Sequence, residues 1–274
     1  MNGFVYEPFL PADESAQVWR YLDLDKLLWA IREKKLWLTL LEQFRLKSDS
    51  FEASVPEQTK AIDALVTRGK EHLYNQVMPS FLEPGSRSTA PRYELLDKLA
   101  DIARQRKALL RAAYASCWCM GEESEAMWQL YSRGKDGVAM RTTFSRLKDS
   151  VRHDPYTIVS RVEYIDYRKG ALARHKYDYD PALHKRIAYR HEQEVRVLRA
   201  RQEDFIRAGQ FPQFSADEHV AIDWEPEAII EAIVLSPLSP EAYFEVFKDA
   251  IKRHSPILAE LVQRSELITD APRY

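Results

Sequence analysis

Glycine is scarce in this sequence, with only 8 residues in 274, and none of them forms GxGxxG, GxxxxGK[ST] or GxSxG. These three patterns mark the dinucleotide-binding turn, the phosphate-binding loop and the nucleophile elbow. In each, glycine allows a sharp turn or a close approach of the backbone to the ligand. Their absence argues against a Rossmann site, a Walker loop and an α/β-hydrolase nucleophile.

Cysteine and paired histidine ligands are also scarce. The only two cysteines, Cys117 and Cys119, lie two positions apart in "ASCWCM". Neighbours on one strand make poor disulfide partners, so we expect reduced thiols and a cytoplasmic protein. Neither HExxH nor HxH occurs among the seven histidines. Two thiols without nearby histidines are too few for a zinc site, so no metal is expected.

The chain has little net charge and no long apolar run. Its 40 basic and 42 acidic residues give a formal charge of −2. This balance provides no global electrostatic reason to expect nucleic acid or an anionic membrane as a partner. The first residues, "MNGFVYEPFLPADES", show no signal-peptide pattern, and no apolar stretch approaches twenty residues. With 45% apolar residues, the composition is that of a soluble globular protein.

Periodicity in the first half predicts a strand, a helix and a strand over "QVWRYLDLDKLLWAIREKKLWLT". Asp23 or Asp25 is available to cap the helix. Residues 57–80 and 92–113 have helical patterns and flank a loop rich in Pro, Gly and Ser. We interpret about 57–112 as a helical insertion, because the strands on either side need each other.

The second half alternates irregularly between strands and helices. Strands are predicted for "AYASCWCM", "VAMRTTF", "TIVSRVEYIDY", "EHVAIDW" and "EAIVLSP", with an Asp-Gly turn before the second. Helices are predicted for "SEAMWQLYS", "DPALHKRIAYRHEQ" and "SPEAYFEVFKDAIKRH", the last beginning at Ser239 or Pro240. This order favours a single α+β domain over residues 1–274, with a mixed, largely antiparallel sheet and flanking helices.

The stretch "HEQEVRVL", residues 191–198, carries the candidate chemistry. If Val195 and Val197 enter the core of a strand, Glu192, Glu194 and Arg196 share its other face. The two carboxylates are then roughly 7 Å apart. A solvated face makes them ordinary surface charges. A face that lines a cleft makes them functional candidates.

Motifs across the chain resemble a bacterial family known as domain of unknown function 2971. They are "WRYLDLDKLLWAIREKKLWLTLLEQF", "DSFE", "ASCWCMGEESEAMWQLYS", "KDGVAMRTTFSRL", "VEYIDY", "EQEVRVL" and "IIEAIVLSPLSPEAY". The resemblance runs from about Gln17 to Leu267 and lacks only the helical insertion. It implies no function.

A more distant resemblance is to ADP-ribosyltransferases of the Arg-Ser-Glu type. Arg20 in "WRY" takes the arginine position, and Ser116 in "ASCW" takes the serine position. Glu192 and Glu194 in "EQEV" take the Glu-x-Glu position, with Glu194 as the catalytic member. The sequence departs from the pattern at Ser-Cys-Trp, where the family usually has Ser-Thr-Ser.

This resemblance implies an ADP-ribosyltransferase-like fold and a reaction on NAD⁺. Cleavage of the nicotinamide–ribose bond builds positive charge on the ribose, which a buried Glu194 can stabilise. Arg20 suits the diphosphate, and Tyr21 or Trp118 suits stacking on nicotinamide. Ser116 is expected to hold the ribose or the strand, and Glu192 to polarise the nucleophile. The resemblance also implies a macromolecular acceptor and a role in a bacterial toxin or phage-defence system.

Other interpretations stay open at this point. Arg20 is as well explained by an ion pair with Asp23, and Ser116 by its small size. The protein is alternatively a non-enzymatic interaction module whose helical insertion docks a partner. A third hypothesis is a metal-dependent nuclease that uses Glu163, Asp166 and Lys169.

Overall fold

The computed structural model describes residues 8–47, 53, 108–132, 134–167, 179–200 and 217–268. Within these ranges the protein is a mixed α+β structure with a largely antiparallel sheet, as predicted. The expected insertion at 57–112 lies outside the described residues except for 108–112, which are helical. None of the described helices is long and apolar enough to cross a bilayer.

The predicted strand, helix and strand near the N-terminus are confirmed as β1 (Gln17–Asp23), α1 (Leu24–Glu33) and β2 (Lys35–Leu40). Helix α1 buries Leu27, Ala30 and Ile31 against the sheet. Asp23 stands at the N-cap position without a side-chain capping bond, because its carboxylate binds Lys26 instead.

The other elements follow in chain order. They are α2 (Leu41–Lys47), β3 (Ala113–Met120), α6 (Glu125–Tyr131), β4 (Gly137–Thr143), α7 (Phe144–Ser150), β5 (Thr157–Arg161), β6 (Glu163–Ile165), η2 (Asp180–Leu183), β7 (His184–Arg186), η3 (Ile187–Glu192), β8 (Glu194–Ala200), β9 (His219–Asp223), α9 (Pro226–Ile229), β10 (Ala232–Leu235), α10 (Tyr243–Lys252), α11 (Pro256–Ala259), β11 (Val262–Arg264) and η4 (Glu266–Ile268), where η denotes a 3-10 helix.

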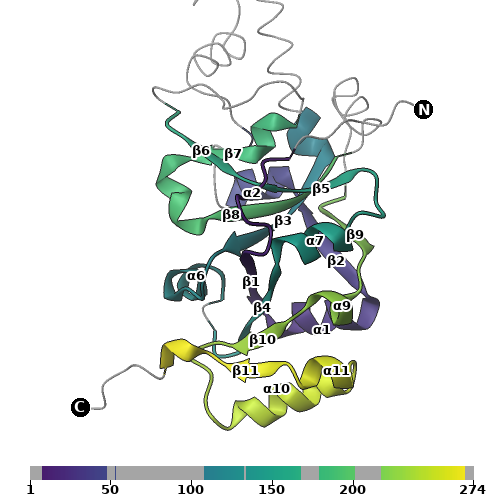
Figure 1. The fold of residues 1–274 in the computed structure, drawn as a ribbon, viewed down its shortest axis with the longest axis vertical. Helices are drawn as coiled ribbons and strands as arrows, with labels where there is room; N and C mark the ends of the chain where they lie inside the picture. The colour runs from purple at the N-terminus through teal and green to yellow at the C-terminus, as the bar shows by residue number, and fades with distance from the viewer. Residues whose placement is uncertain are drawn as a thin grey trace, which may run out of the picture.

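Strand β3 is the centre of the main sheet. Along one edge it pairs with β8, which in turn pairs with β5. Its other edge is shared by two arms, β1-β4-β10-β11 and β2-β9. All of these pairings are antiparallel except β10 with β11. A separate pair, β6 and β7, lies on the other side of β3 from α10 (Figure 1).

The sheet divides where the two arms meet β3. Strand β1 contacts the end of β3, with Trp19 opposite Cys119, whereas β2 contacts its beginning, with Thr39 opposite Ala115. On that edge, residues 116–118 have no strand partner among the described strands. Beyond this point β1 continues along β4 and β2 continues along β9. The result is a split in the sheet with β3 at its apex.

Three of the predicted elements are wrong in detail. The helix predicted over residues 180–193 is instead η2, β7 and η3. Strand β7 pairs with β6, and this tertiary pairing overrides the local helical pattern. The strand predicted over 157–167 breaks at Val162, whose N–H donates to the Glu194 carbonyl before β6 leaves the main sheet. Helix α10 also begins at Tyr243 rather than at Ser239 or Pro240.

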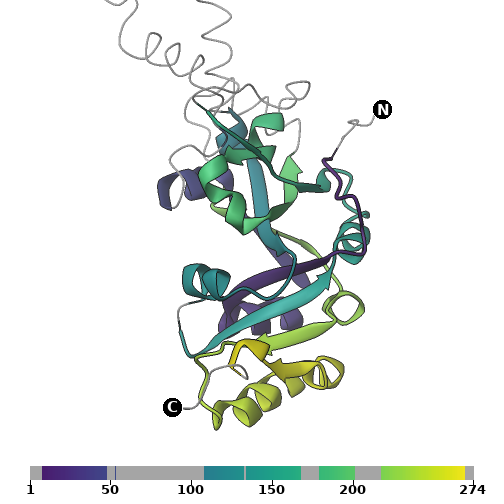
Figure 2. The ribbon, with the colours of Figure 1, turned by 60° about the vertical axis from the view of Figure 1, so that its left-hand side comes forward.

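The two faces of the main sheet differ in what covers them. One face carries the largest apolar cluster, which includes Val18, Leu38, Val195 and Val197 and packs against α1, α7 and α10. The opposite face carries two smaller apolar clusters, one around Leu198 and one around α6. Figure 2 shows α6 and α10 on different sides of the arm that contains β1 and β4.

Gly137, at the start of β4, is required by a close approach to Ser132. A Cβ at this position would lie 1.9 Å from Ser132 Oγ and 3.1 Å from Ser132 Cβ. We expect Gly137→Ala to lower the free energy of unfolding by about 1–3 kcal/mol through overpacking. Adding Ser132→Ala should restore part of the loss, since it removes the nearer atom. Urea denaturation measures both, and a Gly137→Ala protein as stable as wild type would contradict the prediction.

Candidate functional site

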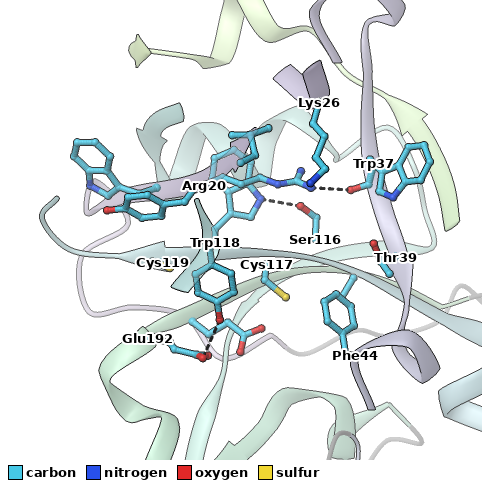
Figure 3. Close-up of a pocket in the computed structure, with 16 residues that line it drawn as sticks. Arg20, Lys26, Trp37, Thr39, Phe44, Ser116, Cys117, Trp118, Cys119 and Glu192 are labelled. Atoms are coloured by element: carbon cyan, nitrogen blue, oxygen red, sulfur yellow. Dashed lines mark hydrogen bonds between the residues drawn. The ribbon is translucent and has the colours of Figure 1, made fainter. Parts of the chain in front are cut away.

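A cavity of about 310 Å³ lies at the split in the sheet. We call it the split cavity. All six residues proposed from the sequence border it, namely Arg20, Tyr21, Ser116, Trp118, Glu192 and Glu194. Figure 3 shows Arg20 and Glu192 on opposite sides of this cavity, with Cys117 between them. Segments that are far apart in the chain therefore meet where the two arms diverge from β3.

These residues reach the split cavity from opposite faces of the sheet. In the register of β3 and β8, Ser116 lies opposite Val197 and Trp118 opposite Val195, so both belong to the face of the main core. Glu194 lies opposite Cys119 and therefore belongs to the other face. Side chains from both faces border one space because residues 116–118 have no described strand on one edge.

Arg20 spans the split from β1 to β2. Its Nη2 donates to the Trp37 carbonyl at 3.3 Å, and its guanidinium lies 5.9 Å from the centre of the Trp118 ring (Figure 3). The alternative ion pair with Asp23 is not formed, since Asp23 binds Lys26. Burial lowers the pKa of Arg20 to about 10, so the group stays charged at neutral pH. Among the described residues, no carboxylate forms an ion pair with Arg20.

The other candidates from β1 and β3 form walls of the split cavity; they are Tyr21, Ser116 and Trp118. Trp118 Nε1 donates to Ser116 Oγ at 3.1 Å, and the Trp118 ring is buried. The Tyr21 hydroxyl accepts a hydrogen bond from the Ser124 N–H, and its ring meets Trp128 edge-on at 4.9 Å. Burial raises the pKa of Tyr21, which stays a neutral phenol.

Glu194 is a buried carboxylate held by two cations. Arg196 Nε donates to its Oε1 at 2.6 Å, and Lys185 Nζ donates to its Oε2 at 2.9 Å. Only 3% of Glu194 and 1% of Arg196 is exposed, so this strand face is not a solvated one. Burial alone would raise the pKa of Glu194, but the charges of Arg196 and Lys185 outweigh it and hold the pKa well below its usual value.

Glu192 belongs to η3 and not to the strand, which corrects the predicted alternation. Gln193, between the two glutamates, has a φ of 41° and turns the chain. The two carboxylates nevertheless converge, because Lys185 Nζ also donates to Glu192 Oε2 at 2.5 Å. The Tyr131 hydroxyl donates to Glu192 Oε1 at 2.9 Å.

The sequence does not identify Lys185 as a site residue, because the pattern over residues 180–193 predicts a helix. Strand β7 delivers its ammonium group between the two carboxylates. Burial would lower the pKa of Lys185, but the negative charges of Glu194 and Glu192 outweigh burial and raise it above its usual value. Lys185, Arg196, Glu192 and Glu194 thus form a buried network of two cations and two anions, which we call the ion network.

Neither cysteine is prepared for nucleophilic chemistry. Burial and the negative charge of Glu194 raise the pKa of both Cys117 and Cys119, so both stay protonated thiols. Lys169, which the nuclease hypothesis requires, lies outside the described residues. No group of three or more metal-ligating side chains occurs in the described part of the chain.

The ion network makes stability depend on pH in a defined direction. Since the pKa of Glu194 is lower in the folded protein than the unfolded value of about 4.3, its stabilisation is complete above that value. It is lost as the pH falls towards the folded pKa. Glu194→Gln should cost about 3–5 kcal/mol at pH 7, because two buried cations lose an anion. It should also flatten the decline of stability between pH 5 and pH 3.

Denaturant unfolding at several pH values tests this expectation. Glu33→Gln is the matched control, since Glu33 is a partly exposed partner of Arg32 and its removal should cost less than about 1 kcal/mol. An acid decline in Glu194→Gln as steep as in wild type would show that Glu194 does not carry it.

One of three comparisons with known proteins gave a match. Residues 127–197 match the family described as "Protein of unknown function (DUF2971)". The match covers α6 to β8 and is shorter than the resemblance expected over Gln17–Leu267. No match was found among curated proteins or among solved structures. This segment, which contains Tyr131, Lys185, Glu192 and Glu194, is therefore similar to the DUF2971 family.

Proposed function

We propose that this protein is an NAD⁺-consuming enzyme of the ADP-ribosyltransferase type, with an ADP-ribosyltransferase-like fold and a macromolecular acceptor. The observation that carries the proposal is that Arg20, Ser116 and Glu194 border one cavity although they come from three distant segments. The cavity volume lies at the lower end of the range for small-molecule sites.

The proposed reaction begins with cleavage of the bond between the nicotinamide nitrogen and ribose C1′. The bonding electrons leave with nicotinamide, which departs as a neutral molecule without a general acid. The positive charge that develops on the ribose resembles that of glycoside cleavage. Glu194, which is ionised and buried, stabilises this charge and accepts a hydrogen bond from a ribose hydroxyl. The nucleophilic atom of the acceptor, polarised by Glu192, then bonds to C1′ and releases its proton to water.

Arg20 is the proposed diphosphate ligand. Its guanidinium lacks an ion-pair partner among the described residues and offers several N–H donors in one plane. Ser116 is proposed to hold the nicotinamide ribose. Tyr21 and Trp118, whose rings already pack within the protein, are proposed as walls against which nicotinamide lies.

A non-enzymatic interaction module is the second candidate function, and the ion network is the observation that favours it. Both oxygens of Glu194 already accept hydrogen bonds from Arg196 or Lys185, so its charge is compensated within the protein. A purely structural network requires no substrate. In that case the segment at 57–112 carries the function, and changes at Arg20 leave it intact.

We further propose that the protein acts in the bacterial cytoplasm. Cys117 and Cys119 are free cysteines, which agrees with a reducing, cytoplasmic environment. A role in a bacterial toxin or phage-defence system rests on the resemblance to ADP-ribosyltransferases alone.

Arg20→Gln separates catalysis from folding better than a change in the ion network does. We expect it to raise the KM for NAD⁺ about ten- to hundredfold, the loss that follows from removing charge-assisted hydrogen bonds. The free energy of unfolding should change little, because Arg20 makes one long hydrogen bond and a ring contact. Nicotinamide release and labelled ADP-ribose transfer to lysate components measure the activity.

Arg32→Gln is the matched control, since Arg32 is largely exposed on α1 and pairs with Glu33. Glu194→Gln should abolish nicotinamide release, and this result counts only if near-ultraviolet circular dichroism shows a native fold. Wild-type protein that neither releases nicotinamide nor transfers label would refute the enzymatic proposal and favour the interaction module.

A further inference from the structure

A second cavity, of about 400 Å³, lies beneath α1 and adjoins the split cavity. We call it the α1 cavity. The two cavities have four lining residues in common, which are Arg20, Leu22, Lys26 and Trp37. Arg20 points across the gap between β1 and β2, so it stands at the junction of the two spaces (Figure 3).

The α1 cavity has the walls of a site for a planar ring. Trp29 and Trp37 meet at an interplanar angle of 82° with their centres 5.2 Å apart, which forms an aromatic corner. His219 stacks on Trp37 at 3.7 Å and supports it. Leu22 and Met140 add apolar surface. A planar heterocycle placed in this corner lies against one indole and meets the edge of the other.

The charges around the α1 cavity favour an anion at the junction. Lys26 and Asp25 stand at its exposed rim, where Lys26 pairs with Asp23 and Asp25 accepts a hydrogen bond from the Lys26 N–H. Solvent weakens these rim charges. Arg20 is deeper, and no described carboxylate forms an ion pair with it. An anionic group that passes the rim of either cavity therefore reaches Arg20, a cation without a described acidic partner.

We infer that the α1 cavity binds the adenosine half of NAD⁺, with the diphosphate at Arg20 and the nicotinamide ribose half in the split cavity. The layout of the protein matches that of a dinucleotide, in which two ring-bearing halves are joined by two phosphates. Each cavity lies at the lower end of the range for small-molecule sites and thus suits one half. This inference rests on the proposed function and deepens it.

Isothermal titration calorimetry with AMP tests the site without requiring catalysis. We expect AMP to bind wild-type protein, and Trp29→Leu to weaken it about tenfold, the usual effect of losing one stacked ring. Nicotinamide mononucleotide should lose less than threefold in the same variant. In nicotinamide release, Trp29→Leu should raise the KM for NAD⁺ and leave kcat within twofold.

Two further variants control for folding. Lys26→Glu reverses a charge on an exposed rim residue, so we expect the fold to be retained and AMP binding to weaken more at low salt than at high salt. Tyr243→Leu removes an exposed aromatic ring on α10, away from both cavities, and should change neither ligand.

The outcomes separate the inference from the function on which it rests. Cleavage of NAD⁺ by a protein that does not bind AMP, or AMP binding that Trp29→Leu and Lys26→Glu leave unchanged, overturns the inference and retains the enzyme. AMP binding that both variants weaken, without NAD⁺ cleavage, supports a nucleotide site under α1 and refutes the proposed reaction.

Discussion

One edge of β3 is shared by two strands that leave it in different directions, and the candidate site depends on this constraint. Strand β1 pairs with the end of β3 and β2 with its beginning, so the residues between them face an opening. The opening joins two faces of the sheet that would otherwise be separate. Arg20 crosses it, and both cavities meet there. A continuous sheet would have left Arg20 and Glu194 on opposite sides without a common space.

The ion network fixes the other wall of the split cavity. Four charges are buried on one sheet face between two apolar clusters, and each carboxylate is held by at least one cation. Such a network is costly to form and costly to break, because a charge left without its partner in the interior has no solvent to compensate it. It holds Glu194 ionised and both glutamates in fixed positions. These are the conditions that electrostatic stabilisation of a sugar cation requires, and equally those of a purely structural role.

Local patterns in the sequence identified much of the fold. The spacing of apolar residues located β1, α1, β2 and β3 nearly at their observed bounds, because each buries a regular face. The pattern failed over 180–193, where Lys185 resides. The apolar and charged residues there are spaced as in a helix, but in the structure the backbone of β7 pairs with β6. A residue whose role depends on a pairing between distant strands leaves little local signal, and Lys185 was missed for this reason.

The order of apolar patterns along the chain indicated an α+β fold, and the resemblance to ADP-ribosyltransferases singled out Arg20, Ser116, Glu192 and Glu194 as candidates. The sequence also argued against glycine-based phosphate loops, since the absence of a motif can be recognised without coordinates. The folded arrangement was needed to see that these candidates border one cavity and that Lys185 and Arg196 neutralise the carboxylates. It was also needed to see that Arg20 has no acidic ion-pair partner among the described residues. Alternation along a strand assigns each side chain to one face of the sheet, and this can be predicted from a single segment. Whether side chains of both faces border one cavity depends on the split between β1 and β2, which arises from pairings between distant segments.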